Sequence, residues 1–172
     1  MAVKRIAISE SVAAKLKEMA ANASGTVKVG FIDSDQAMIA YWNEFGHGGR
    51  FSSPPRPFFR TMVANESSRW PEMLGTQLKR MKMDGKLALA EVGSKIEGQL
   101  KRSIRNFDSP PLSPVTLRLR AKFGNQPQEI GLRDVYQAIK DVQNGEKIAS
   151  GTQAKPLIWT GQMINATSWK VE

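Results

Sequence analysis

The 172-residue chain contains no cysteine and only one histidine. The lack of cysteine excludes disulfides and thiolate metal sites, so stability must come from packing or from partner subunits. No stretch approaches the roughly 20 apolar residues that a membrane span requires, and the first residues lack the apolar core of a signal peptide. We therefore expect a protein that makes no membrane contact and is assembled in a cytoplasm.

Catalytic and metal-binding patterns are also missing from the sequence. His47 stands between glycines with no second histidine nearby, which favours a solvent or interface histidine over a metal ligand. Asp33 and Asp35 fall in a predicted turn, where aspartates usually bond their own backbone. The glycines of 46–49 are not followed by the lysine and hydroxyl pair of a phosphate-binding loop. We expect no enzymatic activity, no cofactor and no bound metal.

What is present is an ordinary globular composition with a basic balance. The chain is 41% hydrophobic and 24% charged, which predicts a folded protein, and its length suits a single domain spanning residues 1–172. Lysine and arginine number 25 against 16 acidic residues, a formal charge of +9. Such a surplus attracts nucleic acid or the acidic face of a partner protein, or it serves solubility alone, and charge does not choose among these.

Hydrophobic periodicity predicts an α+β fold, a small antiparallel β-sheet packed against several helices, one of them long. Expected strands are 3–8, 26–32, 37–45 and 166–171, with 26–32 and 37–45 paired as a hairpin and 166–171 completing the sheet. Expected helices are 9–21, 57–68, 71–83, 86–105, 115–123 and 132–144. In the longest helix, one apolar stripe is formed by Leu89, Val92, Ile96, Leu100 and Ile104.

The segment 46–55 is rich in glycine and proline and is predicted to be a long, exposed loop. Such loops often carry contact surfaces. Prolines on both sides of Arg56 stiffen the backbone there, so its guanidinium would be presented on a rigid arm that can bind a carboxylate through two hydrogen bonds. The alternative is that Arg56 and Arg60 satisfy Glu44 or a helix end within the same subunit.

Two motif pairs resemble proteins of the neck of long-tailed bacteriophages, the tail-completion or head-tail connector family. The first is Ala-Tyr-Trp-Asn-Glu-Phe-Gly at 40–46 followed by Pro-Pro-Arg-Pro-Phe-Phe-Arg at 54–60. The second is Leu-Ser-Pro-Val-Thr-Leu at 112–117 followed by Lys-Pro-Leu-Ile-Trp-Thr-Gly-Gln-Met at 155–163. The chain departs from the family at Trp159, where an acidic residue is common, and at 126–148, which resembles a helical insertion.

The resemblance implies a structural virion protein that assembles in the host cytoplasm as a homo-oligomeric ring, a hexamer or dodecamer. It would join or complete head and tail, with portal or connector, tail terminator or tail tube proteins as partners. The residues expected at subunit or partner contacts lie in the two motif pairs and the loop: Glu44, Phe45, Gly46, His47, Arg50, Phe51, Pro55, Arg56, Phe58, Arg60, Lys155, Trp159 and Thr160.

Basic helical segments leave a second function open, non-specific binding of nucleic acid, either by a free DNA-binding protein or as a DNA contact in the ring lumen. No aromatic residues are interleaved with these cations for base stacking, and the sequence contains no recognisable helix-turn-helix or zinc finger motif. The alternative is a solvated helix face that docks on acidic neighbours. Candidate DNA contacts are Lys95, Lys101, Arg102, Arg105, Arg118, Arg120 and Lys122.

Overall fold

The computed structural model describes residues 14, 17, 18, 21, 24–32, 35–49, 52–149, 151, 152 and 154–172. The strand expected at 3–8 and most of the helix expected at 9–21 lie outside the described residues, as do Asp33, Arg50 and Phe51. The described chain is α+β, as predicted, with one long helix and a two-stranded antiparallel sheet.

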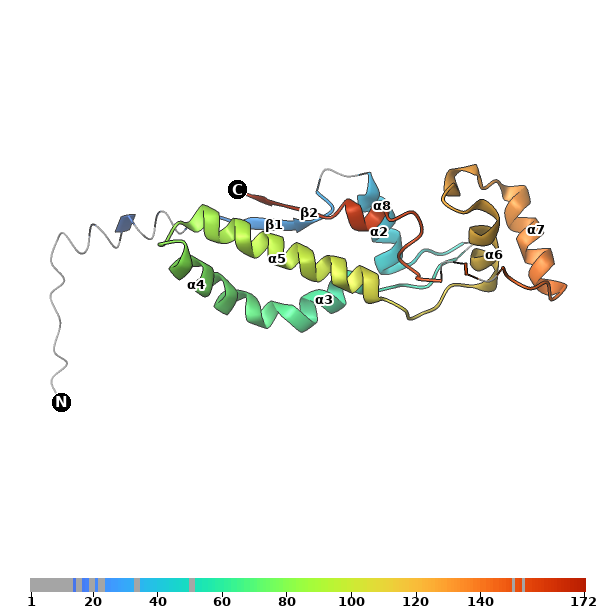
Figure 1. Cartoon of the computed structure of the whole chain (residues 1–172), viewed down its shortest axis with the longest axis horizontal. Coiled ribbons are helices and arrows are strands. Elements are labelled where there is room, and N and C mark those ends of the chain that lie inside the picture. The colour runs from blue at the N-terminus through green and yellow to red at the C-terminus, as the bar shows by residue number, and fades with distance from the viewer. Residues whose placement is uncertain are drawn as a thin grey trace.

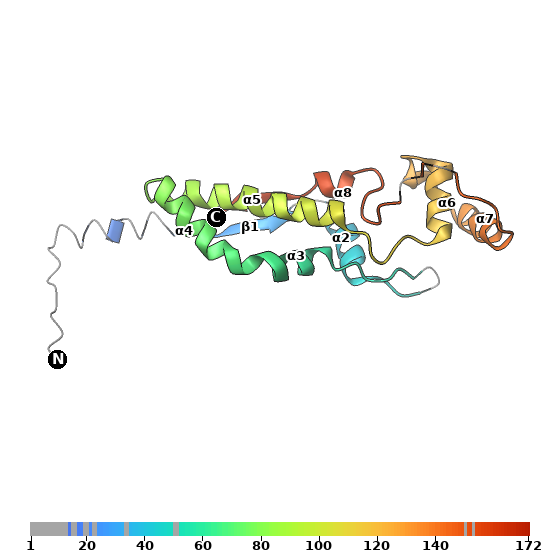
Figure 2. The same cartoon turned by 60° about the horizontal axis from the view of Figure 1, so that its bottom comes forward.

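The elements form two packing groups along an elongated molecule (Figure 1). The larger group contains β1 (Val27–Gly30), α2 (Gln36–Phe45), α3 (Phe58–Glu66), a 3-10 turn at Ser67–Arg69, α4 (Trp70–Arg80), α5 (Gly85–Asn106), α8 (Gln162–Asn165) and β2 (Ser168–Val171). The smaller group contains α6 (Pro114–Phe123), a 3-10 turn at Pro127–Glu129 and α7 (Leu132–Gln143). Turning the view shows α6 and α7 again at the end opposite β1 and α4 (Figure 2).

Helix α5 is the axis of the larger group, because α3, α4 and both strands pack against it. Asp84 caps the N-terminus of α5, because its carboxylate accepts a hydrogen bond from the Leu87 N–H at 3.0 Å. The predicted apolar stripe is confirmed, since its five members are all buried. Around it the core closes with residues from α3, α8 and the 155–158 segment, including Phe58, Met62, Leu157 and Met163.

The sheet joins two segments far apart in the sequence. Strand β1 pairs antiparallel with β2, with Val27 opposite Val171 and Gly30 opposite Ser168. The strand expected at 166–171 is therefore confirmed. Gly93 of α5 lies against this sheet, and a Cβ there would come within 2.8 Å of Val27 and 3.1 Å of the Trp169 ring. Glycine thus permits the close approach of helix and sheet.

The strand and hairpin predicted at 37–45 are wrong, because this segment is helix α2. Its aliphatic and aromatic content suggested a strand, but Met38, Tyr41, Trp42 and Phe45 follow helical spacing i, i+3, i+4, i+7 rather than alternation. Alanine, methionine and glutamate also favour a helix. The helical turn places Ala40 and Glu44 together on the face that is buried.

The remaining predicted helices at 57–68, 71–83, 86–105, 115–123 and 132–144 are confirmed, with boundaries within a few residues. Ser113 caps α6, as predicted, by accepting from the Thr116 N–H at 3.1 Å, with Pro114 in the first turn. Within the described residues, none of the helices combines the length and apolarity needed to cross a membrane.

Candidate functional site

Helix α2 exposes an apolar surface that is unusually large for ten residues. Met38, Tyr41, Trp42 and Phe45 are each 50–56% exposed and lie in one stripe, with Ile39 beside them. We call these five residues the α2 stripe. The rings of Tyr41 and Phe45 contact each other with centroids 4.8 Å apart and planes tilted by 44°, and the Arg60 guanidinium lies over the Phe45 ring at 4.7 Å. The sequence prediction included Phe45 but missed the other four, although their helical spacing was visible.

Glu44 fixes α2 to the first turn of α3. Its side chain is buried, and its carboxylate accepts from the backbone N–H groups of Phe59 at 2.9 Å and Arg60 at 3.1 Å. The Arg60 Nε also donates to it at 2.8 Å, and Arg60 Nη2 donates to the Glu44 carbonyl at 3.2 Å. A carboxylate at a helix N-terminus is favoured by both the unpaired N–H groups and the helix dipole. Arg60 therefore pairs with Glu44 of the same subunit, which was the alternative to a contact with a neighbour.

The loop after α2 is closed on itself. His47 and Ser53 exchange backbone hydrogen bonds of 3.1 and 2.9 Å, and the Arg56 N–H donates to the Asn43 carbonyl at 2.7 Å. Gly46 begins the loop at φ 73°, where a Cβ would lie 2.6 Å from the Ser53 carbonyl oxygen. His47 and Pro55 are exposed at the surface, whereas Phe58 is a core residue. Among the predicted contact residues, His47 and Pro55 can thus reach a partner, whereas Phe58 packs in the core beneath them.

Arg56 does not project from a surface arm as the prolines suggested, because it is only 6% exposed. Its Nη1 donates to the Ser53 hydroxyl at 2.9 Å. Its buried Nε has no hydrogen-bond partner among the described residues, and none of the described carboxylates forms an ion pair with it. Burial lowers the pKa of Arg56.

A second buried arginine, Arg120, joins α6 to the 155–158 segment of the larger group. Its Nη1 donates to the Lys155 and Ile158 carbonyls at 2.8 Å each, and Nη2 donates to the Pro156 carbonyl at 3.3 Å. The Trp159 ring lies 5.1 Å from its guanidinium carbon. Burial, and then the positive charge of Arg56, lower the pKa of Arg120 to about 10. We call Arg120 and its three carbonyls the arginine clamp.

Trp159 and Lys155 of the C-terminal motif pair take part in contacts with α6, whereas Thr160 does not. The Trp159 indole N–H donates to the Gly124 carbonyl, so Trp159 also ties the end of α6 to the larger group. The side chain of Lys155 is exposed, and it is its carbonyl that Arg120 binds. Thr160 is half-buried and its hydroxyl accepts from the Gln162 N–H at 3.3 Å, at the start of α8.

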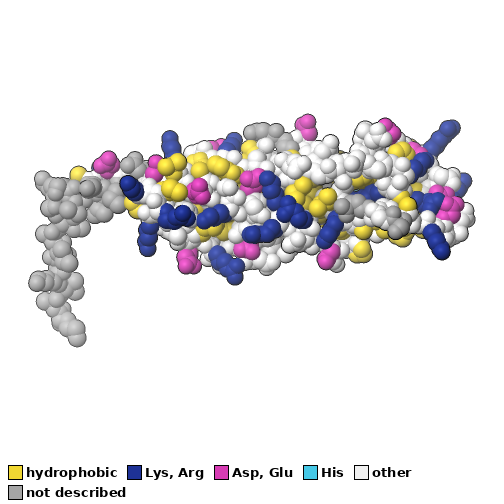
Figure 3. Space-filling model, viewed as in Figure 1, with side chains coloured by type: hydrophobic (Ala, Val, Ile, Leu, Met, Phe, Trp, Pro, Cys, Tyr) yellow, Lys and Arg dark blue, Asp and Glu magenta, His cyan; other side chains and the backbone are white. Residues whose placement is uncertain are grey.

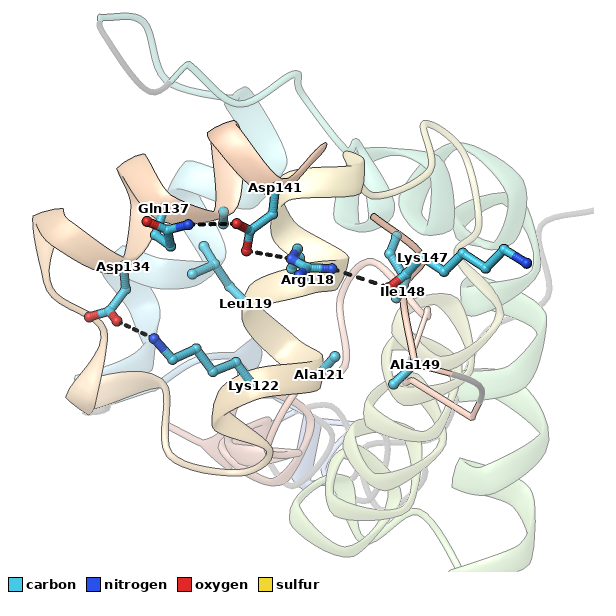
Figure 4. Close-up of a pocket in the computed structure, with 11 residues that line it drawn as sticks. Arg118, Leu119, Ala121, Lys122, Asp134, Gln137, Asp141, Lys147, Ile148 and Ala149 are labelled. Atoms are coloured by element: carbon cyan, nitrogen blue, oxygen red, sulfur yellow. Dashed lines mark hydrogen bonds and ion pairs between the residues drawn. The ribbon is translucent and has the colours of Figure 1, made fainter. Parts of the chain in front are cut away.

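The basic residues of α6 are held by α7 and the segment after it (Figure 4). Arg118 Nε donates to Asp141 at 2.6 Å, another of its nitrogens pairs with Glu146, and Nη1 donates to the Lys147 carbonyl at 3.1 Å. Lys122 pairs with Asp134 at 2.7 Å. The hydrogen bond from Arg118 lowers the pKa of Asp141, and that from Lys122 lowers the pKa of Asp134. The pocket between these helices is therefore lined by side chains that are already joined in internal ion pairs.

The basic residues of α5 differ, because three of its four candidates are exposed. Lys95, Arg102 and Arg105 enter no ion pair within the described part of the chain, whereas Lys101 pairs with Glu97 at 2.6 Å. Across the molecular face in Figure 3, cationic side chains are spread along the whole length with acidic ones between them. The candidate DNA residues therefore do not form one continuous surface, since Arg120 is buried and Arg118 and Lys122 are paired.

Among the described residues no group of three or more histidine, cysteine or acidic side chains could hold a metal ion. Comparison of the chain with protein-family models, with curated proteins and with solved structures gives no match in any of the three.

Proposed function

We propose that the protein is a non-enzymatic structural subunit that binds copies of itself in a ring and acts in the virion neck of a long-tailed bacteriophage, where it joins or completes head and tail. The observation that carries the protein-binding part is the α2 stripe. A contiguous exposed apolar patch on a soluble protein marks an interaction site, and tryptophan and tyrosine supply much of the binding energy at interfaces. The phage assignment rests on the two motif pairs.

The support beneath the stripe is rigid, as a docking surface requires. Glu44 on the opposite face of α2 is held by three hydrogen bonds to α3, and the Asn43 carbonyl accepts from Arg56. A preorganised surface binds at lower entropic cost than a mobile one. The exposed rings of Tyr41 and Trp42 can therefore be buried by a neighbour without reordering the helix that carries them.

A ring also needs a second, different surface on each subunit, because closed cyclic assemblies use head-to-tail contacts. Helix α7 supplies a candidate. Leu132 is 67% exposed and Tyr136, one turn later, is 37% exposed. We call these two residues the α7 patch. It lies in the smaller packing group, away from α2 (Figure 1).

The test is the oligomeric state of the double variant Tyr41→Ser, Trp42→Ser, measured by sedimentation velocity over a range of concentrations. We expect wild type to form a closed oligomer and the variant to remain a monomer with unchanged circular dichroism. Leu87→Ser is the matched control, because Leu87 is 54% exposed on α5 outside the stripe. A wild-type chain that stays monomeric at every concentration would refute the proposal.

A second candidate function, non-specific nucleic-acid binding, is favoured by the exposed cations of α5. Lys95, Arg102 and Arg105 lie at helical spacing i, i+7, i+10 and can neutralise phosphates. A salt titration on duplex DNA tests it: replacing all three by glutamine should reduce the slope of log K against log salt by about 0.9 per lost contact. Wild-type affinity that does not change with salt would exclude this function.

A further inference from the structure

We propose that the turn between α4 and α5 binds the surface of a membrane that contains anionic lipids. In both Figure 1 and Figure 2 this turn lies at the end of the molecule opposite α6 and α7. The sequence predicts no membrane contact because it has no spanning segment, but a peripheral contact needs none. The residues that would make the contact are exposed or half-buried: Lys79, Arg80, Lys82, Met83, Lys86 and Leu87. We call these six residues the hairpin tip.

The hairpin tip carries a concentrated positive charge. Its four cations are all exposed, and none of them forms an ion pair within the described part of the chain. Asp84 is the single acidic residue of the segment 79–87, whose formal charge is therefore 4 − 1 = +3. Its carboxylate already accepts from the Leu87 N–H. The cations of the tip are therefore available to an anionic surface.

Two residues of the tip hold the backbone in a strained conformation. Lys82 and Met83 have φ values of 51° and 67°, in the left-handed region that favours glycine. The Met83 N–H donates to the Leu78 carbonyl at 2.8 Å, which closes the turn. Glycine at either position would relieve the strain, yet the chain has a lysine and a methionine there. Because strained residues concentrate at functional sites, we attribute these two side chains to a contact that they make.

Apolar side chains lie among these cations. Leu87 is 54% exposed, and Met83 is half-buried. Figure 3 shows apolar and cationic side chains next to one another at this end of the molecule. An anionic bilayer offers phosphate groups to the lysines and an acyl boundary to leucine and methionine. The backbone of DNA offers the phosphates alone and would leave Leu87 without an apolar partner.

The composition of the tip favours a lipid surface over the acidic face of a protein. Protein interfaces are enriched in arginine and aromatic residues and depleted in lysine. Three of the four cations of the tip are lysines, and the segment 79–87 contains no aromatic residue. The tip also shares no residue with the α2 stripe or the α7 patch. The lipid contact therefore goes beyond the proposed assembly and does not depend on it.

The experiment measures co-sedimentation of the full chain with vesicles of phosphatidylglycerol and phosphatidylcholine, against vesicles of phosphatidylcholine alone. We expect binding to the anionic vesicles only. Lys82→Gln with Lys86→Gln should weaken this binding by about 25-fold, at about fivefold per lysine. Lys95→Gln with Arg102→Gln is the matched control, because it removes the same charge from exposed positions of α5 outside the tip. Equal affinities of the two double variants would overturn the proposal.

Replacing Lys82 with glycine tests the strain and the contact together. Lys82→Gly should raise Tm by about 2–4 °C, because glycine adopts a φ of 51° without strain. The same change should weaken binding to the anionic vesicles by about fivefold. Opposite changes in stability and binding identify a side chain that serves a contact instead of the fold. Vesicle binding of Lys82→Gly that equals wild type would contradict the lipid contact.

A footprint on wild type keeps the test decisive if a variant fails to fold. Acetylation of Lys82 and Lys86 should slow when anionic vesicles are added, whereas acetylation of Lys95 should not. Equal labelling rates with and without vesicles would overturn the proposal. Binding to duplex DNA or to polyglutamate, with none to the vesicles, would assign the tip to another partner and overturn it too. The proposed ring fails separately, because a chain that stays monomeric can still bind vesicles.

Discussion

Glu44 is the residue on which the position of α2 depends. Replacing it with glutamine keeps the size of the side chain but removes the charge that pairs with Arg60 and attracts the N-terminus of α3. We expect Glu44→Gln to lower the free energy of unfolding by about 1–3 kcal/mol, because hydrogen bonds to a buried charged group are worth more than neutral ones. Urea unfolding measures this. Glu91→Gln, at an exposed position of α5, is the control and should change stability little.

A substitution at Gly46 tests the structure of the loop after α2. A side chain at φ 73° is strained, and its Cβ would collide with the backbone at Ser53 and Pro55. Gly46→Ala should therefore destabilise the protein by more than about 1 kcal/mol. Gly48→Ala is the matched control in the same loop, because a Cβ there meets nothing within 4 Å. Equal unfolding midpoints for the two variants would contradict the structural role of Gly46.

At the scale of single residues, the sequence indicated which side chains are important but not whether they are exposed or buried. The prolines around Arg56 did indicate a fixed backbone, but local sequence could not show that its side chain would be only 6% exposed. Whether an arginine is exposed or buried depends on which distant segments pack over it. The pairing of Glu44 with Arg60 was among the alternatives because both lie within the first motif pair.

At the scale of elements, α2 shows where propensity misleads. A segment with isoleucine, tyrosine, tryptophan and phenylalanine suits a strand by composition. The spacing of these residues suits a helix. The helical pattern is hard to recognise because the largest apolar residues face solvent instead of the core. Amphipathic patterns are read on the assumption that apolar residues are buried, and an exposed docking face violates that assumption. The long helix α5 was predicted correctly because all its apolar stripe is buried.

The contact between α6 and α7 predicts an acid-sensitive element. Asp134 and Asp141 have pKa values below the ordinary 3.8 when folded, so they bind fewer protons in the folded than in the unfolded state. Their stabilising contribution is present above pH 3.8 and is lost as pH falls from there through the folded pKa values.

The measurement is Tm as a function of pH from neutrality to below 3.8. Asp141→Asn should reduce the acid-induced fall in Tm, because one of the two carboxyls with a lowered pKa at the α6–α7 contact no longer titrates. Asp108→Asn, an exposed residue outside these ion pairs, should leave the fall unchanged. A profile for Asp141→Asn that parallels wild type at every pH would contradict the role of the Arg118 pair.

For the whole molecule, the α2 stripe and the α7 patch make a prediction about assembly. A variant with a disrupted α2 stripe, Tyr41→Ser with Trp42→Ser, keeps an intact α7 patch; Leu132→Ser with Tyr136→Ser keeps an intact α2 stripe. Each variant alone should be monomeric. Mixed in equal amounts they should form a heterodimer through the one intact contact, since neither can extend further. Sedimentation of the mixture checks this, and monomers after mixing would show that the two surfaces do not meet.

Overall shape was beyond prediction from the sequence. The α+β class, the long helix and the last strand followed from periodicity, but the division into two packing groups depends on contacts made by α6 and α7. The segment 126–148 was interpreted as an insertion, and it forms the helix that carries the α7 patch. Whether it is an insertion stays a prediction.

The arginine clamp has a mechanical consequence. Arg120 and Trp159 hydrogen-bond across the junction to carbonyls at 155, 156, 158 and 124, so these bonds help to set the angle between α6–α7 and the rest. With the α7 patch at the far end of this lever, a small rotation at the clamp becomes a larger displacement at its tip. If copies join through α2 and α7, the diameter of the closed assembly is adjusted at this hinge, which lies outside both the α2 stripe and the α7 patch.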